Sequence, residues 1–172
     1  MPESKTIKKA RKAKRQGKSP ATQAGEFVRE EIKSIRRGEH GARSTKQAIA
    51  IGLSQARRAG VKLPPPKKGE VSERTRRSAE RAYHKGQTEP SSKTNPRRSR
   101  AIKQALKREG KEAASPGALA RQAKEQARER TSEERSAIAR KAARTRLAHQ
   151  SHAERSRIAR KAARTRAARH GK

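Results

Sequence analysis

Large apolar side chains are concentrated in one short stretch of this chain. Nine of them lie between Ala24 and Leu63, whereas the 106 residues after Pro66 hold only eight of comparable size. Because a folded unit needs buried apolar area to offset the entropy of ordering its backbone, the sequence predicts one folded unit in this stretch. The nine are Phe27, Val28, Ile32, Ile35, Ile49, Ile51, Leu53, Val61 and Leu63.

The spacing of these residues predicts two helices joined by a turn. Ser19-Pro20 is typical of a helix start, and apolar residues then recur at helical spacing until Gly38. Ser44 and Gln47 form a possible capping box for the second helix, which ends before Gly60 and the three prolines that follow. We therefore expect a helical hairpin over residues 19–63 with a core of Phe27, Val28, Ile32, Ile35, Ile49 and Leu53.

The predicted hairpin has little free energy to spare. At about 1.5–3 kcal/mol for each buried large side chain, nine such residues scarcely balance the cost of ordering the segment. We therefore expect marginal folding or self-association as a homo-oligomer through residues 24–63.

The rest of the chain is too polar to build a core of its own. Its 172 residues carry a net charge of +33 with only 28% apolar residues, and segments of this kind stay disordered or conditionally helical until they are neutralised. The expected fold class is mostly α, with a short helical hairpin, Ala/Arg-rich helices, disordered basic linkers and little common core. The expected regions are a basic flexible arm (1–18), the hairpin (19–63), a Pro-rich linker (64–71), short basic helices with breakers (72–130) and a tandem basic repeat (131–172).

Helix signals recur beyond the proline-rich linker. Asn95-Pro96 and Ser115-Pro116 repeat the cap-plus-proline arrangement of Ser19-Pro20, and glycines separate the intervening stretches. These signals predict helices near residues 72–85, 96–109 and 116–130.

The last region contains a duplication. Residues 134–146 return as residues 154–166 with twelve of thirteen positions identical. Thr131 with Glu134, and Ser151 with Glu154, occupy equivalent capping-box positions, so both copies are predicted to begin a helix in the same way.

The repeat predicts a cationic helix face. At about 100° per residue, Arg140, Lys141 and Arg144 fall within one arc, Arg157 joins the matching arc of the second copy, and Ile138 and neighbouring alanines fall on the other side. A solvated helix surface is the alternative, but three Glu against thirteen Lys and Arg in residues 132–172 favour an anionic partner. The candidate nucleic-acid-binding residues here are Arg140, Lys141, Arg144, Arg146, Arg157, Arg160, Lys161, Arg164 and Arg166.

A second basic cluster lies near the start of the chain. We interpret it as a flexible phosphate-binding arm, with a chance match to a nuclear-localisation pattern or a solubility tail as alternatives. Its candidate residues are Lys8, Lys9, Arg11, Lys12, Lys14 and Arg15.

Residues for catalysis or metal binding are scarce. The chain has no Asp and no Cys, which excludes Asp-dependent triads, EF-hand loops and thiolate metal sites. His149 and His152 have a ligand-like spacing, but a polar pair at the repeat junction explains them better than a metal site. We expect no enzymatic activity, no cofactor and no metal. Without a long apolar run or a secretory signal, we expect no membrane span and a cytoplasmic location.

One segment carries a family resemblance. Residues 46–56 read Lys-Gln-Ala-Ile-Ala-Ile-Gly-Leu-Ser-Gln-Ala. This run resembles an uncharacterised family of small basic bacterial proteins with the core Lys-Gln-Ala-Ile-Ala-Ile-(Ala/Gly)-Leu-Ser-x-Ala, in which Gly52 stands where Ala is usual. The tail more loosely resembles bacterial linker-histone-like basic repeats. The resemblance implies a bacterial protein, and a nucleic-acid-binding protein in the bacterial cytoplasm is expected at the nucleoid. The resemblance implies no activity.

These observations together predict a histone-like, nucleoid-associated protein that contacts phosphates with little sequence specificity. Double-stranded DNA is the preferred partner, because recognition by base stacking needs aromatic residues and the chain has one Phe, one Tyr and no Trp. One alternative is an RNA- or ribosome-associated basic protein. Another is an oligomeric assembly protein whose tails bind any polyanion, including anionic membrane.

Overall fold

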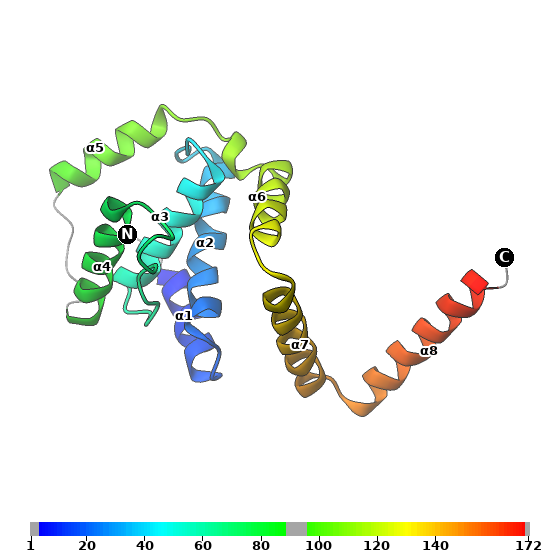
Figure 1. The fold of residues 1–172 in the computed structure, drawn as a ribbon. Coiled ribbons are helices and arrows are strands. Elements are labelled where there is room, and N and C mark those ends of the chain that lie inside the picture. Colours follow the sequence, from blue (N-terminus) through cyan, green and yellow to red (C-terminus); the bar gives the residue numbers. More distant parts are fainter. Residues whose placement is uncertain (1–3, 89–95, 171–172) are drawn as a thin grey trace. The chain divides into compact units, whose positions relative to one another are not determined.

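A computed structural model describes residues 4–88 and 96–170, and within them the fold is helical with no strand (Figure 1). The chain divides into two compact units, one up to Ala123 and one from Lys124 onwards, which we describe separately. The mostly α fold class predicted from the sequence is confirmed. The helices are α1 (Ser4–Arg15), α2 (Pro20–Arg37), α3 (Thr45–Arg58), α4 (Glu73–Thr88), α5 (Pro96–Lys107), a 3-10 turn η1 (Glu112–Ala114), α6 (Pro116–Arg128), α7 (Ser132–His149) and α8 (His152–His170).

The first unit is built on the predicted hairpin of α2 and α3. The Ser19 side chain accepts a hydrogen bond from the backbone N–H of Thr22, and α2 ends at Gly38 in a left-handed conformation. At the start of α3, the Ser44 side chain accepts a hydrogen bond from the backbone N–H of Gln47, 3.1 Å away. Both helices therefore begin at the N-cap serines that the sequence indicated, but the Ser44–Gln47 capping box is not reciprocal, because Gln47 Oε1 accepts from the backbone N–H of Arg43 and not of Ser44.

Most, but not all, of the predicted core residues are buried. Phe27 and Ile35 are completely buried and Ile32 is nearly so, while Val28 and Leu53 are partly buried against the same clusters. Ile49 is only half-buried and belongs to neither cluster, so it contributes less to the core than its position in the pattern suggested.

Alpha-helices 2 and 3 approach closely where α3 has no side chain. A Cβ atom on Gly52 would lie 2.7 Å from Cα of Val28 and 2.9 Å from its backbone nitrogen. Glycine at this position lets the two backbones come together, which explains why two short helices with few large side chains form a tight pair.

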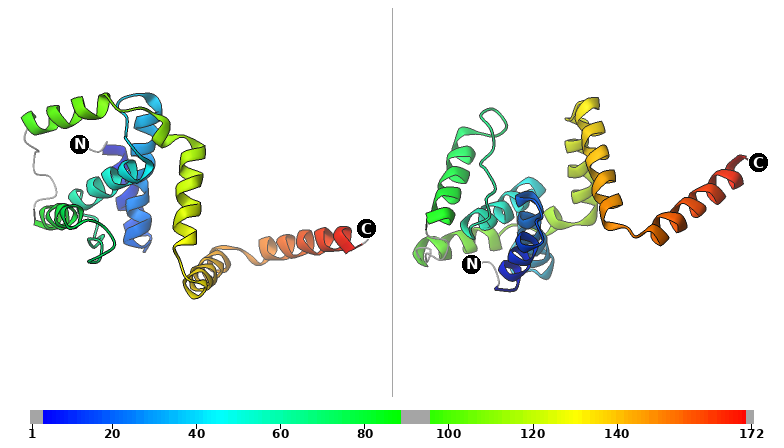
Figure 2. Two further views of the ribbon diagram at one scale, coloured as in Figure 1. Left: turned by 45° about the horizontal axis from the view of Figure 1, so that its top comes forward. Right: turned by 90° about the horizontal axis from the view of Figure 1, so that it is seen from below.

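The basic segment at the start of the chain packs on the hairpin. The sequence predicted a flexible arm over residues 1–18, but Ser4–Arg15 form α1, which lies along α2 (Figures 1 and 2). Ala10 and Ala13 are buried, and Ala10 belongs with Phe27 to one core cluster against which Ile7 packs. The prediction of a flexible arm is therefore wrong for this segment. The sequence did not indicate the contact with α2, because two alanines among many lysines make it.

Small residues also join later segments to the hairpin. Alpha-helix 4 packs on α3 and buries Ala79 and Ala82, and Ala113 and Ala114 of η1 enter the cluster formed by Ile32 and Ile35. Buried contacts of the first unit therefore extend beyond the hairpin, and the buried apolar residues form two separate clusters, one joined by η1 and the other by α1.

Hydrogen bonds hold η1 in place. Thr45 Oγ1 donates to the carbonyl oxygen of Ala113 over 2.8 Å, and Arg36 Nε donates to that of Ala114 over 2.8 Å. Both donors belong to the hairpin, so η1 closes the end of α2 and α3 although it lies about seventy residues later in the chain.

The proline segment after α3 is anchored by a buried arginine. Arg57 donates from Nε to the carbonyl oxygen of Leu63 over 3.2 Å and from its Nη2 to that of Pro64 over 3.0 Å. Burial lowers the pKa of Arg57 from its ordinary value, and the carbonyl dipoles compensate for part of the lost hydration. Arg57 thus fixes the direction in which the chain leaves the hairpin.

The second unit consists of α7 and α8 with the end of α6. Residues 131–148 of the structure are all exposed, so α7 has no buried face in the chain. Among the helices that the structure describes, none is long and apolar enough to cross a bilayer.

Candidate nucleic-acid interface

Both copies of the tandem repeat begin at a reciprocal cap. At α7, the backbone N–H of Glu134 donates to Thr131 Oγ1 over 3.2 Å and the backbone N–H of Thr131 donates to Glu134 Oε2 over 3.0 Å. At α8, the backbone N–H of Glu154 donates to Ser151 Oγ over 3.2 Å and the backbone N–H of Ser151 donates to Glu154 Oε2 over 3.0 Å. The duplicated capping boxes set the same register in both helices, which fixes where each cation lies around the helix axis.

A second duplicated bond lies midway along each helix. Thr145 Oγ1 donates to the carbonyl oxygen of Lys141, and Thr165 Oγ1 donates to that of Lys161, each over 3.0 Å. These hydroxyl groups are satisfied within their own helix. The groups that remain available to a partner are the ends of the lysine and arginine side chains.

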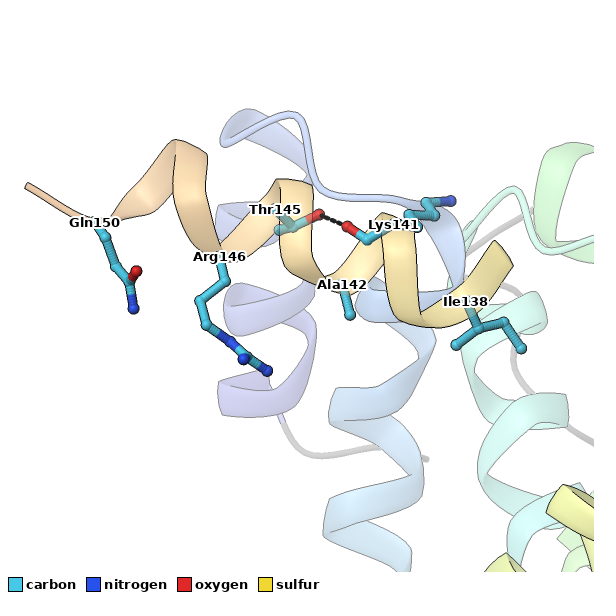
Figure 3. Close-up of a pocket in the computed structure, with 6 residues that line it drawn as sticks. All are labelled: Ile138, Lys141, Ala142, Thr145, Arg146 and Gln150. Atoms are coloured by element: carbon cyan, nitrogen blue, oxygen red, sulfur yellow. Dashed lines mark hydrogen bonds between the residues drawn. The ribbon is translucent and has the colours of Figure 1, made fainter. Parts of the chain in front are cut away.

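The cations of α7 are less cleanly segregated than the sequence pattern suggested. Figure 3 shows a shallow hollow along one side of the helix, lined by Ile138, Lys141, Ala142, Thr145, Arg146 and Gln150. Arg146 extends on the same side as Ile138 and Ala142, whereas Lys141 extends away from them (Figure 3). Positive charge therefore surrounds much of the helix, and the arc of Arg140, Lys141 and Arg144 is its densest part.

The second copy carries one more cation in the dense arc. Arg157 occupies the position that Ala137 has in the first copy, and it is exposed beside the arc of Arg160, Lys161 and Arg164. The remaining predicted residue of this helix, Arg166, corresponds to Arg146 of the first copy and is also exposed. The structure therefore leaves every predicted cation of the repeat accessible.

Apolar side chains on the repeat also lack a partner within the chain. Ile138, Leu147 and Ile158 are 49%, 54% and 50% exposed. A helix that buries nothing gains no stability from packing, so α7 and α8 depend on their caps, their alanines and whatever neutralises their charge.

Ion pairing distinguishes the two units. Arg29, Arg37 and Arg76 each lie within 3.0 Å of a glutamate oxygen in the first unit. Two arginines that hydrogen-bond Glu73, Arg76 and Arg77, lower the pKa of that carboxyl to about 2. In the described part of residues 131–168, by contrast, no lysine or arginine lies within ion-pair distance of a carboxylate. The repeat thus carries charge that the chain itself does not neutralise.

The predicted N-terminal cluster is also exposed, but on a folded surface. Lys8, Lys9, Arg11, Lys12 and Arg15 lie on the solvent side of α1. Lys14 is exposed as well, and together with Arg11 it borders a cavity of about 100 Å³ that Ile7 and Phe27 also line. This cluster belongs to the first unit and the repeat to the second.

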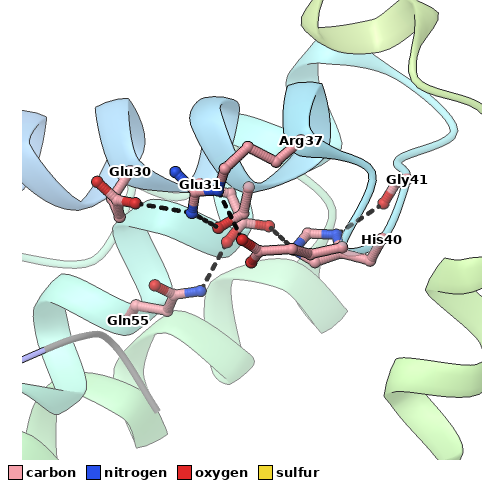
Figure 4. Close-up of polar contacts among 8 residues, drawn as sticks. Glu30, Glu31, Arg37, His40, Gly41 and Gln55 are labelled. Atoms are coloured by element: carbon pink, nitrogen blue, oxygen red, sulfur yellow. Dashed lines mark hydrogen bonds and ion pairs between the residues drawn. The ribbon is translucent and has the colours of Figure 1, made fainter.

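A buried polar cluster in the hairpin had no counterpart in the sequence prediction (Figure 4). The Glu31 carboxylate is buried; Gln55 Nε2 donates to its Oε2 over 2.7 Å, and its Oε1 lies 3.4 Å from Nε2 of His40. Burial raises the pKa of Glu31, while His40 and Gln55 oppose the rise. His40 Nδ1 lies 3.1 Å from the carbonyl oxygen of Gly41, so this nitrogen carries a proton and Nε2 faces Glu31.

The cluster links three parts of the hairpin. Glu31, His40 and Gln55 come from α2, the turn and α3, so Glu31 connects α2 to both of the other segments. Within the described residues, no group of three or more potential ligands is arranged to hold a metal ion. Of the pair predicted at the repeat junction, His149 and His152, the side chain of His149 lies outside the described residues.

Comparison with known proteins finds a family match for the first part of the chain only. Residues 5–68 match a family of unknown function, DUF6496, over α1, α2, α3 and the proline segment. The match agrees with the resemblance to an uncharacterised family, and the repeat lies outside it, so the tail's likeness to linker-histone-like repeats stays a prediction. No curated protein and no solved structure matches the chain.

Proposed function

We propose that this protein coats double-stranded nucleic acid, with DNA preferred, by placing the repeat helices α7 and α8 against the phosphate backbone. The observation that carries the proposal is the duplicated, exposed and internally unneutralised charge of these two helices. An isolated helix of this kind repels itself, and a polyanion removes the repulsion. Duplex DNA is the polyanion whose charge density fits best, as the dimensions of the helix indicate.

The dimensions of the repeat suit a phosphate backbone. Alpha-helix 7 has 18 residues and α8 has 19, so each is about 27–29 Å long at 1.5 Å per residue. Duplex DNA presents one phosphate for about every 1.7 Å of its axis, so each helix can meet several phosphates along a groove edge. Contacts of this type carry no sequence information directly, and we propose a non-specific binder.

The aromatic residues support a duplex over a single strand. Phe27 is completely buried in the core of the first unit, and Tyr83 is half-buried on α4 against His84. Single-stranded nucleic acid is bound largely by stacking its bases on exposed aromatic rings, and this chain has one Phe, one Tyr and no Trp. An RNA-associated role is the competing proposal, and it would act on A-form duplex through the same cations.

The salt dependence of binding tests the proposal. If 6–10 phosphates are neutralised, affinity for duplex DNA should fall by about 10³ to 10⁵ between 50 and 200 mM salt. Replacing Arg140, Lys141 and Arg144 with Gln should reduce the slope of log K against log salt by up to about 2.7, since each phosphate contact contributes about 0.9.

A matched control uses the same loss of charge elsewhere. The triple variant Arg29→Gln, Arg37→Gln and Arg76→Gln removes three cations that are already ion-paired within the first unit. It should leave the slope nearly unchanged. Equal slopes for the two triple variants would show that net charge, not the repeat, governs binding, and a nearly flat salt response of the native chain would sink the proposal. Competition with an RNA duplex of the same length separates the DNA-preferring protein from the RNA-associated one.

A further inference from the structure

The helix α1 carries a second cationic face that is rigidly mounted on the folded unit. Thr6, Ala10 and Ala13 are buried on one side of α1, at 3%, 4% and 7% exposure. These three residues lie on a single side of a helix at about 100° per residue. Their burial fixes which side chains point to solvent.

Six cations occupy the opposite side of α1. They span an arc of about 160° at about 100° per residue, and all six are exposed. The helix holds no acidic residue, and no described carboxylate lies within ion-pair distance of these cations. We call this surface the α1 face, and it consists of Lys5, Lys8, Lys9, Arg11, Lys12 and Arg15.

The α1 face has the charge spacing of a nucleic-acid strand. The helix has 12 residues and is about 18 Å long, so its six cations are spaced by about 3 Å along the axis. Phosphates on one strand of a duplex are spaced by about 3.4 Å along the duplex axis. A rigid cationic face of this density costs little conformational entropy when it meets such a strand, because its backbone is already ordered by packing on α2.

We propose that the α1 face binds a second duplex while the repeat helices hold the first, so that one chain bridges two nucleic-acid segments. The inference rests on the proposed function. The two cationic surfaces belong to separate compact units. Burial of Ala10 and Ala13 fixes which side of α1 faces solvent, and capping boxes fix the register of the repeat helices. A chain with two independent phosphate-binding surfaces acts as a crosslink between neighbouring segments of a polyanion.

A two-duplex capture experiment with the full chain tests this bridging. One duplex is biotinylated and fixed to beads, and a second duplex of unrelated sequence carries a fluorophore. The native chain should retain the fluorescent duplex on the beads at intermediate protein concentration and release it at large excess, when every duplex is covered by its own protein. Binding of the fluorescent duplex alone is measured in parallel by anisotropy.

Two triple variants identify the surface responsible. Lys8→Gln, Lys12→Gln and Arg15→Gln remove the centre of the α1 face without touching its buried side, and they should abolish capture of the second duplex while single-duplex binding falls much less. The control removes the same charge from exposed positions on α5, with Arg100→Gln, Lys103→Gln and Lys107→Gln, and should bridge like the native chain.

The outcomes separate the inference from the function beneath it. A native chain that binds one duplex but never captures a second would overturn the inference and leave the proposed function standing. Bridging that survives the α1 variant would assign it to self-association or to α7 and α8 acting separately, and would also overturn the inference. Equal loss in both variants would attribute bridging to net charge. A native chain that binds no duplex would overturn both proposals.

Discussion

Gly86→Ala tests whether α4 is part of the folded unit. A Cβ atom at this position would lie 1.8 Å from the carbonyl oxygen of Arg57 and 3.0 Å from Cα of Arg58. Both neighbours are backbone atoms of α3 and its end, so no side-chain rotation relieves the overlap. To restore ordinary contact, α4 must move by about 1.5 Å, which separates Ala79 and Ala82 from α3 and costs about 1–3 kcal/mol.

The higher helix propensity of alanine offsets part of this cost. It is worth up to about 1 kcal/mol in a helix interior and less near the end of α4, so we expect a net destabilisation of about 1–2 kcal/mol. Gly25→Ala is the matched control, because a Cβ atom at Gly25 in α2 would meet nothing within 4 Å. This control should stabilise the unit by about 0.5–1 kcal/mol.

Tyrosine fluorescence provides a local assay. Tyr83 is the only tyrosine of the chain and lies on α4, so its emission during urea denaturation reports the docking of this helix rather than the helicity of the tail. The prediction is a lower urea midpoint for Gly86→Ala and a higher one for Gly25→Ala. If both variants shift the midpoint in the same direction and by the same amount, α4 does not pack against α3 as described.

Two further predictions concern the buried cluster and the caps. Burial raises the folded pKa of Glu31 above its ordinary 4.5, so the stabilising contribution of this carboxyl is present below about pH 4.5 and is lost as pH rises through the folded pKa. The stability of Glu31→Gln relative to the native chain should therefore increase as pH rises. Glu31→Ala leaves buried polar partners unsatisfied, so its free energy of unfolding should fall by about 1–3 kcal/mol. Urea titrations at several pH values measure both effects, and a glutamine variant that lost stability towards neutral pH would contradict the first. The double variant Thr131→Ala and Ser151→Ala should remove about 1 kcal/mol of helix stability from each repeat. The circular dichroism signal of the free protein at 222 nm should therefore weaken. An unchanged spectrum would show that the caps do not stabilise α7 and α8.

Local signals made the hairpin and most helix starts predictable. Ser19-Pro20, Ser44 and Thr131 satisfy backbone N–H groups within the next three residues, so their effect does not depend on distant parts of the chain. The apolar period likewise placed Phe27 and Ile35 in the core, where both are fully buried.

The docking of α1, α4 and η1 was not predictable, because it depends on small residues. Ala10, Ala79 and Ala113 are buried at contacts between elements, yet alanine is equally common on exposed faces of this chain. Only the arrangement in space shows which alanines face a partner. Because these alanine contacts could not be identified from the sequence, the sequence analysis predicted a flexible arm and a marginally stable core.

The register of the candidate interface was predictable from the sequence. Capping boxes and cation positions follow from sequence spacing, and the same spacing places Arg146 on the side of Ile138 and Ala142, so charge extends around the helix. The cluster of Glu31, His40 and Gln55 joins residues up to 24 positions apart, and no local pattern indicated it.

Permuting the repeat tests the central claim that ordered helices display the cations to phosphate. Residues 132–169 are rearranged at constant composition in the full chain, which keeps every charge and destroys the caps and the register. The measurement is duplex-DNA affinity at one fixed salt concentration, together with the change in circular dichroism at 222 nm on binding. We predict that the native chain binds duplex DNA more tightly than the permuted chain does. The native chain should also gain helicity on binding, because phosphates relieve its repulsion, and the permuted chain should not. Equal affinity without a gain of helix in either chain would contradict the account, because the tail would then act as a disordered polycation.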